Sequence, residues 1–176
     1  MRYFIACTLF LLQSCSYQNA TPEYITLLDQ TTLKFNQNIG KEHQLRCSGY
    51  GGSLMDDISM VSLDYEVIKK SDIPGSRQLL VFCVDKLATL INADAKLQPF
   101  LHETPFPANR IKLGITFVDK KGDFISDGTP AYIFTLKGKI YYSKYDPVKK
   151  RLEDLWEEDY AEALRIVQSE TPQGAP

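Results

Sequence analysis

The sequence predicts an α+β domain in which an antiparallel sheet of about five strands is covered on one face by helices. Apolar and polar residues alternate over 61–67 and again over 113–117, as they do in strands that bury one face. Apolar residues recur at helical spacing in three other segments. The expected order is helix, two strands, helix, three strands, helix. That order favours helices gathered on one side of the sheet.

The first helix is expected to start at Thr21 as its cap and to stop before Gly40, because threonine caps helices and glycine ends them. A short strand should follow at 45–47. The alternating segment over 61–67 is then expected to be the second strand. Together these elements predict a helix and two strands in the first third of the chain.

The central helix is expected to run from about 77 to 92. Pro74 and Gly75 mark a boundary before it, and Ser76 can cap its first turn. Residues 79–91 are apolar on most sides of the helix, which indicates a helix buried in the centre of the domain.

The second half should contain three strands and a helix. A strand is expected over 111–118, followed by a polar loop over 119–130. Residues 131–136 and 139–145 should form a hairpin, because Gly138 allows the positive φ that a tight turn needs. This register opposes Phe134 to Tyr141 and Ile133 to Tyr142. A last helix is expected over 153–168, with Trp156 on its apolar face.

Composition fits one globular domain. The 176 residues are 44% hydrophobic and 24% charged, and the formal net charge is −2. No basic surface of the kind that nucleic-acid-binding proteins carry is visible, so no nucleic-acid partner is expected. The folded domain should span 21–168, with a disordered tail over 169–176.

The N-terminus has the pattern of an export signal. Arg2 precedes an apolar run over 3–12, which is too short to span a bilayer and fits a signal peptide. The run closes on Leu12-Gln13-Ser14-Cys15, which resembles the bacterial lipobox. The pattern predicts a signal peptide over 1–14, lipid on Cys15 and a tether over 15–20. The alternatives are a secreted protein with Cys15 incidental and a cytosolic protein with a buried N-terminal helix.

Two cysteines lie in the predicted domain, Cys47 and Cys83. In an exported protein they could form a disulfide across a loop of about 36 residues, which would add about 3–4 kcal/mol of stability. Two separate buried thiols are the alternative. A Cys–His nucleophile would need His43 or His102, and no motif supports it.

A glycine-rich segment is the candidate ligand loop. Its residues are Gly49, Tyr50, Gly51, Gly52, Asp56 and Asp57. Glycines let the backbone approach a ligand, and the tyrosine offers a stacking surface. The segment lacks the Gly-Lys-Ser/Thr ending of a phosphate loop and the Gly-x-Ser-x-Gly elbow of hydrolases. The alternative is a tight connection between two strands, with solvated aspartates.

Two further residue sets could bind ligands. Asp119, Asp123 and Asp127 share a polar loop, but they lack the spacing of a calcium loop, so solvated acids are favoured and no metal or cofactor is expected. The tyrosines could form an aromatic face or divide between the core and the exposed side of the hairpin. They are Tyr132, Tyr141, Tyr142 and Tyr145.

Several modest motifs occur in order along the domain. They are Gly51-Gly52-Ser53-Leu54-Met55-Asp56-Asp57, the alternating strand after it, Arg77 at the helix start, residues 91–101, Pro105-Phe106-Pro107 and the Tyr141-Tyr142 hairpin. With them the chain resembles a group of uncharacterised exported proteins from intracellular bacteria. The resemblance covers about residues 24–155 and implies no known activity.

These observations predict a lipid-anchored protein of the bacterial envelope whose domain binds a partner protein or a small ligand. One alternative is an envelope enzyme that uses Asp56, Asp57 or a histidine. The other is a structural component of the envelope.

Overall fold

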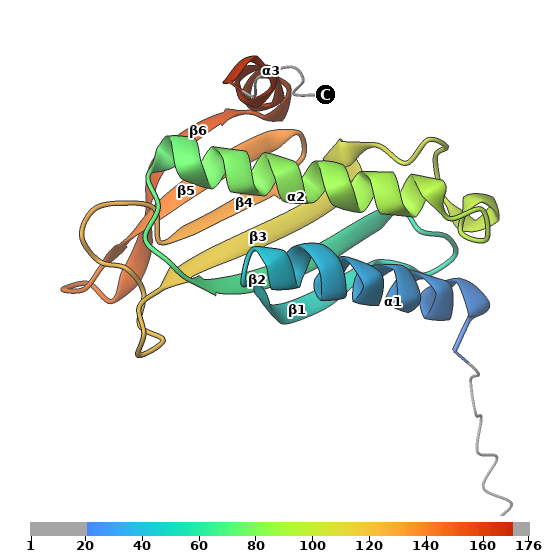
Figure 1. Cartoon of the computed structure of the whole chain (residues 1–176), viewed down its shortest axis with the longest axis horizontal. Coiled ribbons are helices and arrows are strands. Elements are labelled where there is room, and N and C mark those ends of the chain that lie inside the picture. Colours follow the sequence, from blue (N-terminus) through green and yellow to red (C-terminus); the bar gives the residue numbers. More distant parts are fainter. Residues whose placement is uncertain (1–20, 171–176) are drawn as a thin grey trace, which may run out of the picture.

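The computed structural model describes residues 21–170, which form a mixed six-stranded sheet and three α-helices (Figure 1). The strands are β1 (Arg46–Ser53), β2 (Met60–Ile68), β3 (Ile111–Val118), β4 (Tyr132–Leu136), β5 (Lys139–Asp146) and β6 (Arg151–Asp159). The helices are α1 (Glu23–Phe35), α2 (Ile73–Ala93) and α3 (Tyr160–Glu170), with short helical turns η1 (Asn36–Gly40), η2 (Gln98–Phe100) and η3 (Ala108–Arg110). The predicted signal peptide, Cys15, the tether and residues 171–176 lie outside the described residues.

The sheet follows the chain, in the order β1-β2-β3-β4-β5-β6. Every neighbouring pair is antiparallel except β2 and β3, which are parallel. The α+β class is confirmed, but the expectation of about five antiparallel strands was only roughly right. The parallel pair arises because α2 lies between its strands. Its 21 residues span about 31 Å, enough to return the chain along β2 before β3 begins.

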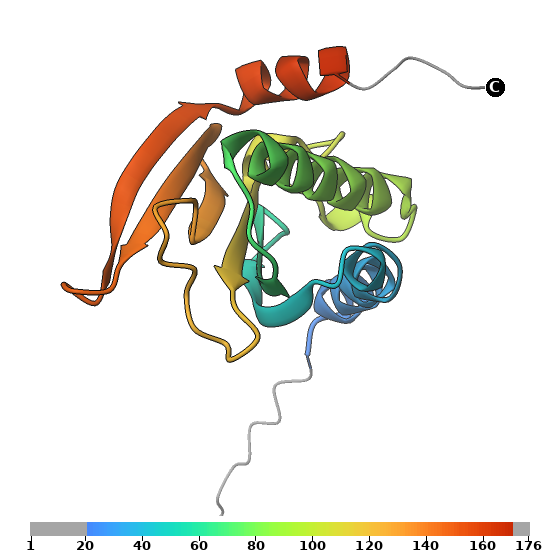
Figure 2. The same cartoon turned by 60° about the vertical axis from the view of Figure 1, so that its left-hand side comes forward.

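The core lies between the sheet and two helices. Figure 2 shows α1 and α2 on the same face, with α3 packed beyond α2. The alternation over 61–67 is confirmed, since Val61, Leu63, Tyr65 and Val67 are all buried. Leu80, Val84, Leu87 and Ile91 of α2 meet them and are completely buried. No helix of the described residues lies on the opposite face of the sheet (Figure 2).

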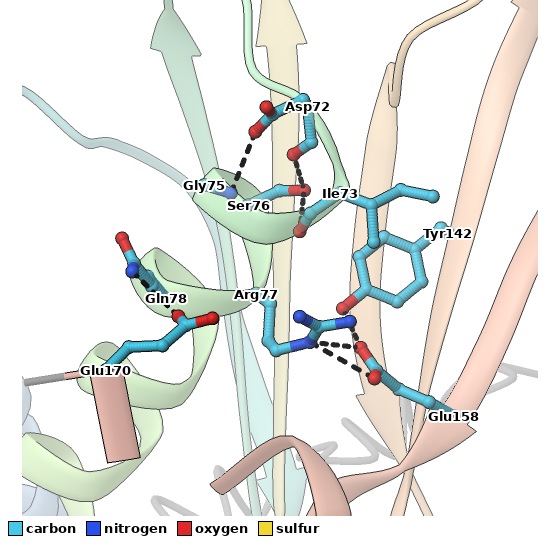
Figure 3. Close-up of polar contacts among 9 residues, drawn as sticks. All are labelled: Asp72, Ile73, Gly75, Ser76, Arg77, Gln78, Tyr142, Glu158 and Glu170. Carbon is cyan, nitrogen blue, oxygen red and sulfur yellow. Dashed lines mark hydrogen bonds and ion pairs between the residues drawn. The ribbon is translucent and has the colours of Figure 1, made fainter. Parts of the chain in front are cut away.

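The start of α2 differs from the expectation. The helix begins at Ile73, with Asp72 as its cap, whose carboxylate accepts a hydrogen bond from the Gly75 amide at 2.9 Å (Figure 3). Pro74 therefore lies in the first turn, where its missing amide hydrogen costs nothing. Ser76 is buried inside the helix and donates to the Ile73 carbonyl at 3.1 Å, so it is not the cap.

The other expected boundaries hold in part. At α1 the cap is Pro22 rather than Thr21, and it makes no side-chain hydrogen bond. The hairpin is confirmed, including its pairing of Phe134 with Tyr141 and Ile133 with Tyr142. Gly138 has a φ of 78° at its turn, which glycine adopts without strain.

The last predicted helix was wrong over its first half. Residues 151–159 form β6, paired with β5, and the helix occupies only Tyr160–Glu170. Asp146 closes the turn before β6, because its carboxylate accepts hydrogen bonds from the amides of Val148 and Lys149. Trp156, expected on the buried face of a helix, is 55% exposed. Ser169 and Glu170, expected in a disordered tail, belong to α3.

A buried ion pair joins β6 to α2. Arg77 Nε donates to both carboxylate oxygens of Glu158, at 2.9 and 3.1 Å, and the Tyr142 hydroxyl donates to the same carboxylate (Figure 3). The Arg77 and Glu158 side chains are only 13% and 9% exposed. The hydrogen bond to Glu158 is the main reason that the pKa of Arg77 is raised. This network fixes β6 at the sheet edge with Glu158 pointing inward.

Replacing Glu158 by glutamine should therefore lower the free energy of unfolding by about 3 kcal/mol, because a buried guanidinium loses its counterion. Tyr142→Phe should cost about 1 kcal/mol, the loss of one hydrogen bond. Lys139→Gln, which breaks the exposed Lys139–Glu157 pair, is the control and should cost under about 1 kcal/mol. Urea denaturation measures all three. Equal costs for Glu158→Gln and the control would contradict this role.

Candidate functional site

The glycine-rich segment is a strand rather than a loop over most of its length. Gly49, Tyr50, Gly51 and Gly52 belong to β1, and only Asp56 and Asp57 lie in the connection to β2. A bulge between Cys47 and Gly49 shifts the register, so Tyr50 faces the same side as α1. The sequence predicted either a ligand loop or a tight connection here, because glycine has low strand propensity. In the structure, pairing with β2 continues the strand through these glycines.

β1 forms one edge of the sheet, at the end opposite β6 (Figure 1). Within residues 21–170 it is paired with β2 and with no other strand. Most of its residues are exposed. In an edge strand, the amides and carbonyls that alternate with the paired ones face outward and can bind another extended segment.

A groove of about 310 Å³ lies between this edge strand and α1. We call it the edge groove; it is lined by Asp29, Thr32, Leu33, Asn36, Cys47 and Tyr50. The four helix residues are spaced by three and four, so they share one face of the helix and its continuation. Leu33 is 54% exposed, although it lies within a helix whose other apolar residues are largely buried.

Tyrosine hydroxyls hold the walls of the edge groove. Tyr50 donates to Asp29 Oδ1 at 2.5 Å, and Tyr65 donates to Asn36 Oδ1 at 2.6 Å. Tyr24 donates to the Leu54 and Met55 carbonyls just beyond β1. Burial, followed by the hydrogen bond and charge of Asp29, raises the pKa of Tyr50, so its phenol stays protonated. Hydrogen bonds within the chain therefore hold the helix and the strand on the two sides of the groove.

Two polar side chains of the edge groove have hydrogen-bonding atoms with no partner among residues 21–170. Asp29 is the one Asp, Glu, Lys or Arg in the lining, and only its Oδ1 has a hydrogen-bond partner within residues 21–170. The Thr32 hydroxyl is buried with no partner in that same part of the chain. Asn36 opens η1, a π-helical turn, and such turns are rare and often lie at functional sites.

The two cysteines within residues 21–170, Cys47 and Cys83, are free. Cys47 is exposed in the edge groove, whereas Cys83 is buried on α2. The Tyr65 hydroxyl interacts electrostatically with both thiols. The disulfide that the sequence allowed is thus not formed in this structure, and the alternative of two buried thiols holds for Cys83 alone. Burial raises the pKa of the Cys83 thiol to about 12, which leaves it protonated at neutral pH.

The two histidines named from the sequence lie in different parts of the domain, and Asp57 is close to only one of them, His102. His102 Nδ1 lies 2.7 Å from Asp57 Oδ2, and both side chains are partly exposed. This contact ties the β1–β2 connection to the segment after η2, alongside the bridge of Ile58 and Leu101. His43 lies elsewhere, with its ring 4.9 Å from that of Phe82, in a separate cavity of about 420 Å³ beside α3.

Asp119 and Asp127 bond to amides of their own loop, and Asp127 also pairs with a lysine outside it. Asp119 accepts hydrogen bonds from the amides of Lys121 and Asp123, which lower its pKa. Asp127 pairs with Lys70 and caps Thr129, so its pKa is also lowered. Across residues 21–170, no three His, Cys, Asp or Glu side chains are placed to hold a metal ion. No helix in this range is both long and apolar enough to cross a membrane.

The hairpin tyrosines divide between the two faces of the sheet. Tyr142 is buried in the core, while Tyr132 and Tyr141 lie on the face that carries no helix. There they stack on either side of Phe134, with ring centroids 5.3 and 5.0 Å apart. Tyr145 stacks separately on Phe124 at 4.9 Å. This aromatic row covers the open face, as the sequence allowed.

No family model, curated protein or solved structure matches this chain. The resemblance to exported proteins of intracellular bacteria therefore stays a prediction. Of the residues that line the edge groove, sequence reasoning placed Tyr50 in its candidate ligand loop and named Cys47 only as a possible disulfide partner. It missed Asp29, Thr32, Leu33 and Asn36. The one feature of the sequence that could have indicated this face of the first helix was Leu33, an apolar residue outside the helix's buried stripe.

β2 passes so close to Gly52 that a side chain would not fit there, whereas neighbouring Gly51 has free space around it. A Cβ at position 52 would lie 2.2 Å from the Met60 carbonyl oxygen, whereas one at position 51 would meet nothing within 4 Å. Gly52→Ala should therefore destabilise the protein by about 2 kcal/mol through overpacking, and Gly51→Ala should be close to neutral. Thermal unfolding of both variants tests this; a neutral Gly52→Ala would contradict the geometry.

Thiol reactivity should separate the two cysteines. At pH 8, iodoacetamide should alkylate Cys47 in the native protein and leave Cys83 unmodified, because Cys83 is buried and its thiol has a pKa of about 12. Peptide mass spectrometry reads each site separately, and urea-unfolded protein is the control in which both should react. Native protein in which neither thiol reacts, and which yields a 47–83 disulfide peptide, would contradict two free thiols and show that the disulfide forms.

Proposed function

We propose that this protein is a lipid-anchored component of the bacterial envelope whose domain is a binding module, with the edge groove as its binding site. The observation that carries the binding role is that β1, within residues 21–170, has a neighbouring strand on one side only and borders the edge groove. The anchoring role rests on Leu12-Gln13-Ser14-Cys15 and the apolar run before it. Lipid would hold the domain at the membrane surface, and the groove would recruit the ligand there.

The enzymatic alternative has one geometric support, the contact between Asp57 and His102. A carboxylate that orients a histidine is part of many hydrolytic sites. Such a site also needs a nucleophile within hydrogen-bond reach of the histidine. In the described part of the chain, Asp57 is the one side chain to which His102 is hydrogen-bonded, and neither residue lines a cavity described above. A structural role in joining two loops fits this pair better.

Intact mass of the protein purified from its own envelope tests the anchoring. The expected mass is that of residues 15–176 plus acyl groups, and Cys15→Ser should remove the acyl groups and leave the protein in the soluble fraction. A cleaved protein without lipid would contradict anchoring and make it a secreted protein. An uncleaved chain would return it to the cytosolic alternative.

Turnover would contradict the binding role. Hydrolysis of ester, peptide or cell-wall substrates that disappears in Asp57→Asn and in His102→Gln would show that the loop pair is catalytic. Asp154→Asn removes one charge from an exposed acid of β6, outside the loop pair, and serves as the matched control.

A further inference from the structure

We infer that the edge groove binds an extended segment of a partner protein by adding it as a seventh strand beside β1, with a lysine or arginine side chain of that segment paired to Asp29. This inference rests on the proposed binding role and specifies its partner. It combines three properties of the site: free backbone groups, a side-chain groove next to them, and an unbalanced negative charge.

Backbone bonding supplies the affinity. β1 is eight residues long and has a neighbouring strand on one side only within the described residues. Strand addition uses such an edge, because main-chain hydrogen bonds bind any extended sequence. The glycines at 49, 51 and 52 leave little side-chain bulk along the edge to obstruct a further backbone.

The groove supplies the selectivity. Alternate side chains of an added strand point to the same face, so those on the α1 side enter between β1 and the helix. The exposed flank of Leu33 can pack against the aliphatic stem of a long side chain. Beyond it, Asp29 offers a carboxylate whose Oδ2 has no partner within residues 21–170, and no Lys or Arg lines the groove.

Charge favours a different protein over a second copy of this chain. Two copies pairing through β1 would bring two identical grooves together, each with its Asp29. The one charged residue of β1 is Arg46, and it is already paired with Glu66 of β2. A second copy therefore offers no uncommitted cation from its own β1, whereas a basic segment of another protein would supply one.

The opposite edge of the sheet is a poor site for the same ligand. β6 carries five acidic residues among its nine, and one of them, the half-buried Glu153, is already bonded to Lys149 and Arg151. Charged side chains along an edge strand oppose the approach of another strand. β1, with one charged residue that is already paired, lacks this protection.

Selection from a displayed library of random heptapeptides against the intact protein is the first test. We expect enriched sequences with strand-forming residues and a lysine or arginine at one fixed alternate position. The best peptide is then synthesised in three forms: unmodified, with glutamine for its basic residue, and with N-methyl groups on alternate backbone amides. Isothermal titration calorimetry measures each affinity, and amide hydrogen exchange locates the bound peptide.

The glutamine peptide and the Asp29→Asn variant should each bind about three- to fivefold more weakly, as expected for one exposed ion pair. Combining the two changes should add little further loss. Methylation of the amides that face β1 should weaken binding about tenfold or more, because several main-chain bonds are lost. Exchange over residues 46–53 should slow on binding. Asp29→Asn keeps an oxygen for the Tyr50 hydroxyl, and Asp56→Asn is the control that should bind normally.

Three results would overturn the inference. One is a library that yields no basic peptide, and another is binding that neither methylation pattern nor Asp29→Asn weakens. The third is sedimentation showing a dimer with β1 protected from exchange, which would place a second copy on this edge. A photo-crosslinking residue at position 141, on the face of the sheet away from α1 and α2, separates the two proposals. If it captured an envelope protein while any of these three results occurred, the binding role would stand and only the edge groove would be excluded as the binding site. An unlipidated mass would instead contradict the anchoring alone.

Discussion

Burial of α2 against the centre of the sheet is the constraint on which the rest of the structure depends. The helix packs on β3 and β4 with side chains that are completely buried, such as Leu80 and Leu87. It also carries the chain from the end of β2 back to the start of β3, which makes that pair parallel. Once this layer is formed, β1 and β4 can add only on the outer sides of β2 and β3, and the sheet grows outward in chain order.

Because both α1 and α2 lie on one face, the sheet keeps an uncovered face and two edges (Figure 2). The open face and the two edges differ in the side chains that they present. Stacked aromatic rings fill the middle of the open face, and acidic residues with ion pairs line β6. β1 has neither feature and instead borders a groove. Edge strands without such protection are the usual sites of strand addition, which is why the proposed binding site lies there.

The Arg77–Glu158–Tyr142 network shows how a charged residue can specify a strand. Glu158 is 9% exposed and meets a guanidinium from α2 and a phenol from β5. A buried ion pair adds little net stability over apolar packing, but it strongly penalises any arrangement that separates its partners. A helix through residues 153–159, which the local sequence favours, would lose the pairing with β5 that holds Glu158 against Arg77. The network therefore selects the strand.

The sequence by itself determined the elements whose patterns are local and strong. These are the alternating strand over 61–67, the central helix, and the hairpin with its register across Gly138. It also placed Tyr50 in a candidate ligand segment, although it expected that segment to be a loop. Each of these features depends on neighbours within a few positions, where side-chain periodicity and turn chemistry are sufficient.

Only the tertiary structure decided β6, the length of β1 and the edge groove. β6 is rich in glutamate and aspartate and has weak intrinsic strand preference, so its conformation comes from pairing with β5. The edge groove joins residues of α1 to residues of β1 that follow them by up to 21 positions, as in the bond from Tyr50 to Asp29. Such contacts depend on how a helix is laid beside a sheet, which the burial of apolar surface over the whole domain determines rather than any local pattern.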